Sequence, residues 1–192
     1  MKILSLLSGV VLGALVSGAA LAQAPAAAPA APPPPPEVKN IGDWLVRCYP
    51  AQTQSPCDMY QQQNDAKSQQ RVLAVSLAYI PRLDKHAIQI SVPLGVSISS
   101  GVVLQAGSYT SAAMPYRRCD RGGCYVEMLI DNNVVDQMNH GGDNALLKVT
   151  ADDGKNYQLK ISLNGFTAAH DSMAEQAKAK AKPEAGAAPA KK

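Results

Sequence analysis

The 192-residue chain carries 18 Lys and Arg against 15 Asp and Glu, and its formal net charge is +3. Five lysines lie in residues 173–192; setting that segment and Lys2 aside leaves 12 basic against 13 acidic residues in the middle of the chain. This balance excludes a nucleic-acid-binding domain with a basic folded face. The middle segment is long enough to bury one core.

The N-terminus has the pattern of an export signal. Lys2 precedes an apolar stretch over 3–16, and Ala20-Leu21-Ala22 forms a small-x-small cleavage site. We predict a signal peptide at 1–22, and the alternative is an uncleaved membrane anchor. Because no later segment reaches transmembrane length, we expect no membrane span in the mature chain. The expected location is the periplasm, or a secreted or outer-membrane-associated position, in a Gram-negative bacterium.

Two segments of biased composition flank the predicted domain. Residues 23–36 are almost entirely Ala and Pro, which predicts an extended polyproline II linker. Residues 173–192 are rich in Lys and Ala and contain one large apolar residue, Met173, which predicts a disordered tail. Such a tail is either a solvated solubility segment or a weak, salt-sensitive contact with an anionic membrane surface.

The globular part, 37–172, alternates apolar and polar residues with a period of two, which is typical of half-buried strands. Turn-forming residues such as Arg121-Gly122-Gly123 interrupt the apolar runs. We predict an all-β fold, an antiparallel sandwich or an open barrel, with short helices at 134–139 and 166–174. The nine expected strands are 44–49, 58–62, 71–80, 88–94, 101–104, 109–118, 124–130, 146–151 and 157–163.

The four cysteines form two close pairs, Cys48 with Cys57 and Cys119 with Cys124. In an oxidising compartment closely spaced thiols become disulfides, and the second pair flanks a predicted hairpin turn. We therefore predict two local disulfides. A four-cysteine zinc site fits these spacings poorly, and a thiol-disulfide oxidoreductase requires a CxxC motif that is absent.

Catalytic motifs are weak. The segment 95–99 begins like a nucleophile elbow but has a serine where the second glycine belongs. A Ser/His/Asp hydrolase remains an alternative only if residues distant in sequence converge. Its candidates are Ser97 of that segment with His86, His140, His170, Asp84, Asp143 and Asp171. We predict no catalytic residue, no metal site and no cofactor.

Together these residues resemble the invasion associated locus B family. The resemblance rests on Trp44 before Cys48, on 93–96 (Pro-Leu-Gly-Val), on Pro115-Tyr116 leading into the second cysteine pair, and on 162–166 (Ser-Leu-Asn-Gly-Phe). It implies an exported alphaproteobacterial protein with a β-sandwich-like domain. It implies a link to host-cell invasion in some members, and no catalytic residues.

We predict a non-enzymatic envelope protein that acts as a binding or adhesion factor. Arg117, Arg118 and Arg121 surround the second cysteine pair, and guanidinium groups on a rigid turn suit carboxylate or phosphate groups. The expected partner is a protein or an anionic component of the envelope or host surface. The alternative function is a structural periplasmic protein with weak anionic contacts. Trp44 and Phe166 are expected in the core.

Overall fold

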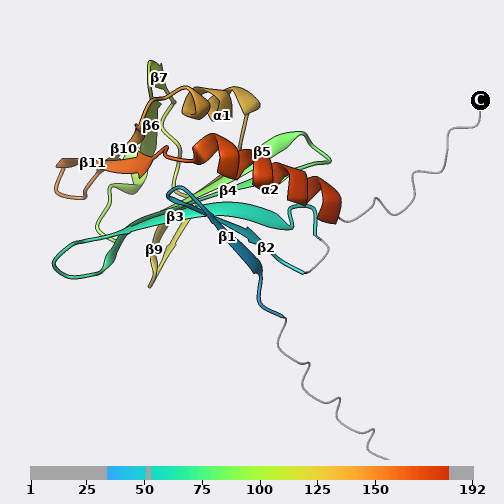
Figure 1. The fold of residues 1–192 in the computed structure, drawn as a ribbon. Helices are drawn as coiled ribbons and strands as arrows, with labels where there is room; N and C mark the ends of the chain where they lie inside the picture. Colours follow the sequence, from blue (N-terminus) through green and yellow to red (C-terminus); the bar gives the residue numbers. More distant parts are fainter. Residues whose placement is uncertain (1–33, 51–52, 182–192) are drawn as a thin grey trace, which may run out of the picture. The chain divides into compact units, whose positions relative to one another are not determined.

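The computed structural model describes residues 34–50 and 53–181 (Figure 1). The predicted signal peptide and most of the predicted linker lie outside these residues, as does 182–192. Within the described ranges, no helix is long and apolar enough to cross a membrane.

Within the described residues, eleven strands and two α-helices follow one another in sequence, with one 3₁₀ turn before β6. Their bounds are β1 Glu37–Ile41, β2 Trp44–Cys48, β3 Cys57–Asn64, β4 Arg71–Ile80, β5 Lys85–Val92, η1 Ile98–Ser100, β6 Val102–Ala106, β7 Tyr109–Thr110, β8 Arg118–Asp120, β9 Gly123–Ile130, α1 Asn132–Asn139, β10 Asn144–Thr150, β11 Asn156–Ser162 and α2 Phe166–Lys180.

The strands form two antiparallel sheets, which confirms the sandwich prediction over the barrel. The larger sheet has the order β1-β2-β3-β4-β5-β9-β8, and the smaller has the order β11-β10-β6-β7. Directly paired residues share a face of a sheet. One such row on the inner face of the larger sheet runs Val46, Met59, Leu77, Ile88, Met128. The first four are almost fully buried, whereas Met128 is 40% exposed.

Helix α2 packs on the same inner face, over β2, β3 and β4 (Figure 1). Its buried residues, Phe166, Ala169, Met173 and Ala177, follow a helical repeat, and Phe166 meets Trp44 edge to face at 5.4 Å. The prediction of a disordered tail is thus wrong over residues 173–180, which belong to α2. Alanine at the contact positions lets the helix lie close to the sheet, so a segment with one large apolar residue still has a buried face.

Two further expectations are corrected. The predicted strand 109–118 is divided into β7 and β8, because Pro115 cannot donate a ladder hydrogen bond and the chain changes sheets there. Strand β1 was missed because its residues are exposed and show no apolar alternation.

The turn between β1 and β2 requires a glycine. Gly42 there has φ +56°, and a β-carbon at this position would lie 2.4 Å from the Asn164 carbonyl oxygen.

Candidate functional site

The cysteines are paired as predicted. Cys48 lies directly opposite Cys57 across β2 and β3, and Cys119 lies opposite Cys124 across β8 and β9. The Cα separations are 4.1 and 4.0 Å. Because each sulfur is bonded to another, the four-cysteine zinc alternative does not describe this structure. No group of three or more His, Cys, Asp or Glu in the described ranges is arranged to hold a metal ion.

The predicted arginines lie around the β8–β9 hairpin, but they differ in availability. Arg118 is placed over the Tyr125 ring at 3.9 Å and forms ion pairs with Asp120 and Glu127. Arg117 lies 3.7 Å from the same Glu127, and its side chain is 71% exposed. Arg121 is exposed and makes no ion pair with any residue that the structure describes. The protein's own carboxylates therefore neutralise Arg118, and Arg121 is the most available of the three.

Asp120 anchors the tip of this hairpin. Its carboxylate accepts a hydrogen bond from the Gly122 backbone N–H at 2.7 Å and another from the Tyr125 hydroxyl at 3.2 Å. These donors, the Gly122 N–H above all, and the nearby Arg118 hold the pKa of Asp120 below its usual value. The tip is thus a rigid, internally paired turn.

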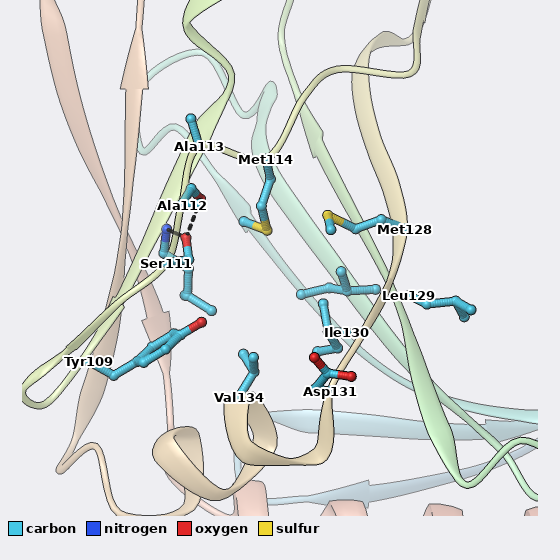
Figure 2. Close-up of a pocket in the computed structure, with 12 residues that line it drawn as sticks. Tyr109, Ser111, Ala112, Ala113, Met114, Met128, Leu129, Ile130, Asp131 and Val134 are labelled. Atoms are coloured by element: carbon cyan, nitrogen blue, oxygen red, sulfur yellow. Dashed lines mark hydrogen bonds between the residues drawn. The ribbon is translucent and has the colours of Figure 1, made fainter.

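An apolar cleft opens between β9 and the segment 111–114, which sequence reasoning missed. It has a volume of about 210 Å³, and its walls come from both sheets and from α1 (Figure 2). Ile88, Met128 and Ile130 line it from the larger sheet, and Leu104 and Tyr109 line it from the smaller sheet. The remaining lining residues are Ser111, Ala112, Ala113, Met114, Leu129, Asp131 and Val134.

Few polar groups in the cleft are free to bind a ligand. The Ser111 hydroxyl accepts from the Leu104 N–H at 2.9 Å and donates to the Ala112 carbonyl at 2.8 Å. Asp131, at the rim, pairs with Lys85 at 3.0 Å. An apolar cavity of about 150 Å³ is large enough for benzene. The cleft therefore suits one aromatic or long aliphatic group, and its methionines can adapt to that group's shape.

A second apolar hollow of about 220 Å³ is lined by residues 92–96, which include the Pro-Leu-Gly-Val motif, and by β11 residues such as Tyr157. Leu94 and Tyr157 are 58% and 52% exposed. This hollow is separate from the cleft and shares no lining residue with it.

Two histidines that are far apart in sequence meet beneath α2. The Nε2 atoms of His86 and His170 lie 2.9 Å apart. Asn132 donates to the Asp84 carbonyl, so its Oδ1 accepts from His86 Nδ1 at 3.0 Å. Neutral His86 must then accept at Nε2 from His170. Burial, and then the neighbouring His170, lower the pKa of His86.

This arrangement brings together some of the hydrolase candidates but no nucleophile. Asp171 lies 3.1 Å from His170 Nδ1. The Ser97 hydroxyl instead lies 2.8 Å from that of Ser100, and His140 contacts the Asp136 carbonyl. Within the described part of the chain, the histidine pair joins α2 to the sheet and has no serine partner.

The two sheets, the two hairpin disulfides and the docked α2 define a disulfide-bonded antiparallel β-sandwich domain. The family model described as invasion associated locus B (IalB) protein matches residues 44–174, and the chain belongs to this family.

Relatives and a solved structure agree with this assignment. The chain is 26% identical over 129 residues to the invasion protein B homologs of Brucella abortus strains 2308 and 9-941, covering 67% of this chain and 74% of each relative. The crystal structure of invasion associated protein B from Bartonella henselae is 23% identical and matches with a TM-score of 0.64. That match covers 74% of this chain and 99% of the other, and it confirms the fold.

Proposed function

We propose that the chain is an exported, non-enzymatic binding protein of the cell envelope, periplasmic or at the outer surface. In this proposal the cleft between β9 and 111–114 holds an apolar group of a partner. Export is supported by the signal-like N-terminus and by two disulfides, which persist in oxidising compartments. A role at the host or envelope surface is supported by the names of the Brucella and Bartonella relatives.

The main observation that supports this proposal is the exposure of the Met128 side chain. Its paired neighbours across the sheet, Leu77 and Ile88, are 1% and 2% exposed, yet Met128 on the same face is 40% exposed because the cleft opens beside it. Fully burying a side chain of this kind contributes about 1.5–3 kcal/mol. A partner group that filled the cleft would gain a share of this energy.

Attachment of labelled protein to outer-membrane fractions and to cultured host cells tests the proposal. Met128→Glu places a charge in the cleft, and we expect attachment to fall about tenfold or more, since one lost apolar contact is enough for that factor. The matched control is Leu94→Glu in the second hollow, which should attach like the unchanged protein. If the two variants attach equally, the cleft is not the site; if the unchanged protein attaches to neither surface, the proposal is wrong.

Arg121 favours a second candidate, a structural protein with weak anionic contacts. Its exposed guanidinium lacks an ion pair in the described ranges, and Arg117 beside it is largely exposed. This candidate predicts binding to anionic lipid vesicles that weakens with salt and with Arg121→Ala. Binding to neutral vesicles of equal strength would contradict it.

A further inference from the structure

We propose that the cleft receives an extended segment of a partner polypeptide, which adds as a strand to the free edge of β9. This mode of binding rests on the proposed function, and it specifies the occupant. The segment has about five residues, with an aromatic or long aliphatic side chain opposite Met128, an acidic residue near Arg117 and a basic residue near Asp131.

The free edge exists because β8 is much shorter than β9. Strand β8 pairs only with Gly123–Tyr125, whereas β5 pairs with β9 from Cys124 to Ile130. The last bond on the β8 side runs from the Arg117 N–H to the Tyr125 carbonyl at 2.8 Å. Beyond it, no hydrogen bond from the described residues reaches the β9 backbone on that side.

Strand geometry identifies the unpaired groups. In an antiparallel strand the backbone groups of alternate residues point to the same neighbour. Tyr125 points toward β8, so the N–H and C=O groups of Glu127 and Leu129 point to the open side. These four groups are the template onto which an added strand would bind.

Strand β11 shows how this protein covers an edge elsewhere. Side chains of the other sheet bind its backbone: Trp44 Nε1 and Gln61 Nε2 donate to the Ser162 carbonyl at 3.0 and 3.2 Å, and Gln63 donates to the Lys160 carbonyl. Folded proteins commonly block exposed strand edges in such ways. The edge at Glu127 and Leu129 has no comparable covering within residues 34–50 and 53–181.

The side chains along this edge match an alternating partner strand. Met128 and Leu129 are 40% and 47% exposed and lie on opposite faces of the sheet, and the cleft lies on the Met128 side. A residue paired with Met128 would point its side chain into the cleft (Figure 2).

Charged side chains at the two ends of the open stretch of β9 determine which end residues the partner segment should have. Arg117 lies at the end where β8 stops, with its side chain 71% exposed, and Asp131 follows the other end of β9, with its side chain 74% exposed. Five extended residues span about 16 Å, the length of this stretch of β9. Arg117 already lies 3.7 Å from Glu127 and Asp131 pairs with Lys85, but both side chains remain largely exposed, so an acid at the first end and a base at the second still complement them.

The experiment titrates soluble peptides into the purified protein and follows its amide resonances. One peptide has the core Asp-Phe-Val-Val-Lys and another the reverse order, which together cover both strand directions; scrambled peptides of the same composition are controls. We expect one order to bind, with slowed hydrogen exchange at the amides of Glu127 and Leu129. If neither order protects these amides, strand addition is wrong.

Two variants at one position separate backbone from side-chain binding. Leu129→Pro removes an outward N–H at an edge where proline is tolerated, and Leu129→Ala keeps it. We expect Leu129→Pro to weaken peptide binding about tenfold and Leu129→Ala to weaken it less. Equal affinities for the two would overturn the proposal, and if Leu129→Pro fails to fold, the exchange measurement on the unchanged protein decides.

The proposed function and this mode of binding fail differently. If Met128→Glu abolishes surface attachment while no peptide binds, the cleft function stands and strand addition is wrong. If the protein instead forms a dimer that buries the β9 edge, as sedimentation and the same amide protection without peptide would show, the occupant is a second copy and the proposed partner is wrong.

Discussion

Replacing Met173 with alanine tests whether α2 is part of the core. Met173 is fully buried between the helix and the sheet, and its sulfur lies 3.3 Å from the Tyr79 backbone nitrogen. Truncating a buried methionine to alanine costs about 2–5 kcal/mol, and a surface helix that can shift toward the sheet favours the lower half of that range. We therefore expect a loss of about 2–4 kcal/mol, or about 6–15 °C in melting temperature for a domain of this size.

Denaturation by urea with the disulfides intact measures this loss. The protein's single tryptophan, Trp44, contacts Phe166 of α2, so its fluorescence reports the packing of the helix on the sheet. Met128→Ala is the matched control, because the same side chain there is 40% exposed in the cleft and should cost about 1 kcal/mol or less. A loss below 1 kcal/mol for Met173→Ala, or equal losses for the two variants, would refute the docked helix.

Three further predictions concern stability. Because burial, and then His170, lower the pKa of His86, the unfolded chain binds a proton before the folded one. The unfolding free energy should thus be highest above about pH 6.5 and fall as the pH drops toward the folded-state pKa of His86. Urea titrations at several pH values should show a flatter pH profile for His86→Gln. Equal profiles for the two proteins would count against this role of His86. Gly123→Ala should cost about 2 kcal/mol or more, since φ is +132° and the added β-carbon would lie 2.2 Å from a backbone oxygen of β5; an unchanged melting temperature would contradict this. Replacing both Cys119 and Cys124 with alanine should lower the free energy of unfolding by about 2 kcal/mol, which is the chain-entropy value for so short a loop. Calorimetry measures the melting temperature, and an unchanged value would contradict this prediction.

The sequence predicted the strands whose two faces differ in polarity. Residues 88–92 show this clearly, because Ile88, Ile90 and Val92 are buried in β5 whereas Gln89 is exposed. In 71–80, whose predicted bounds coincide with β4, large buried residues alternate instead with smaller ones. The disulfides could also be predicted, because each joins residues directly opposite each other in a short hairpin. Both predictions depend on contacts that are local in sequence.

Most of the features that were missed depend on contacts between distant segments, and one depends on which charges pair within a hairpin. The composition of 173–180 suits a solvated tail as well as a helix whose alanines permit close packing, and only the sheet decides between them. The predicted arginines lie together, but pairing with Glu127, nine residues after Arg118, determines which guanidinium is free. His86 and His170 meet only because α2 folds back onto the sheet.

The cleft arises because the segment 111–117 forms backbone hydrogen bonds with strands of both sheets. At one end, Met114 exchanges backbone hydrogen bonds with Val102 of β6 at 2.7 and 2.9 Å; at the other, Arg117 pairs with β9. A chain held by β6 up to Met114 cannot also run beside the last residues of β9, and Pro115, at the crossing, donates no backbone hydrogen bond. The open edge of β9 therefore follows from the topology, and no local pattern in β9 indicates it.

Tyr116, at this crossing, supplies a last test of the local structure. Its hydroxyl is buried and has no hydrogen-bond partner among the described residues, and burial raises its pKa to about 12. An unpaired buried hydroxyl costs about 1–3 kcal/mol, so Tyr116→Phe should leave stability unchanged or raise it by about 1 kcal/mol. Urea denaturation of the two proteins measures the difference. A loss above 1 kcal/mol would mean that the hydroxyl is hydrogen-bonded in solution, and the crossing segment would then differ from the structure described above.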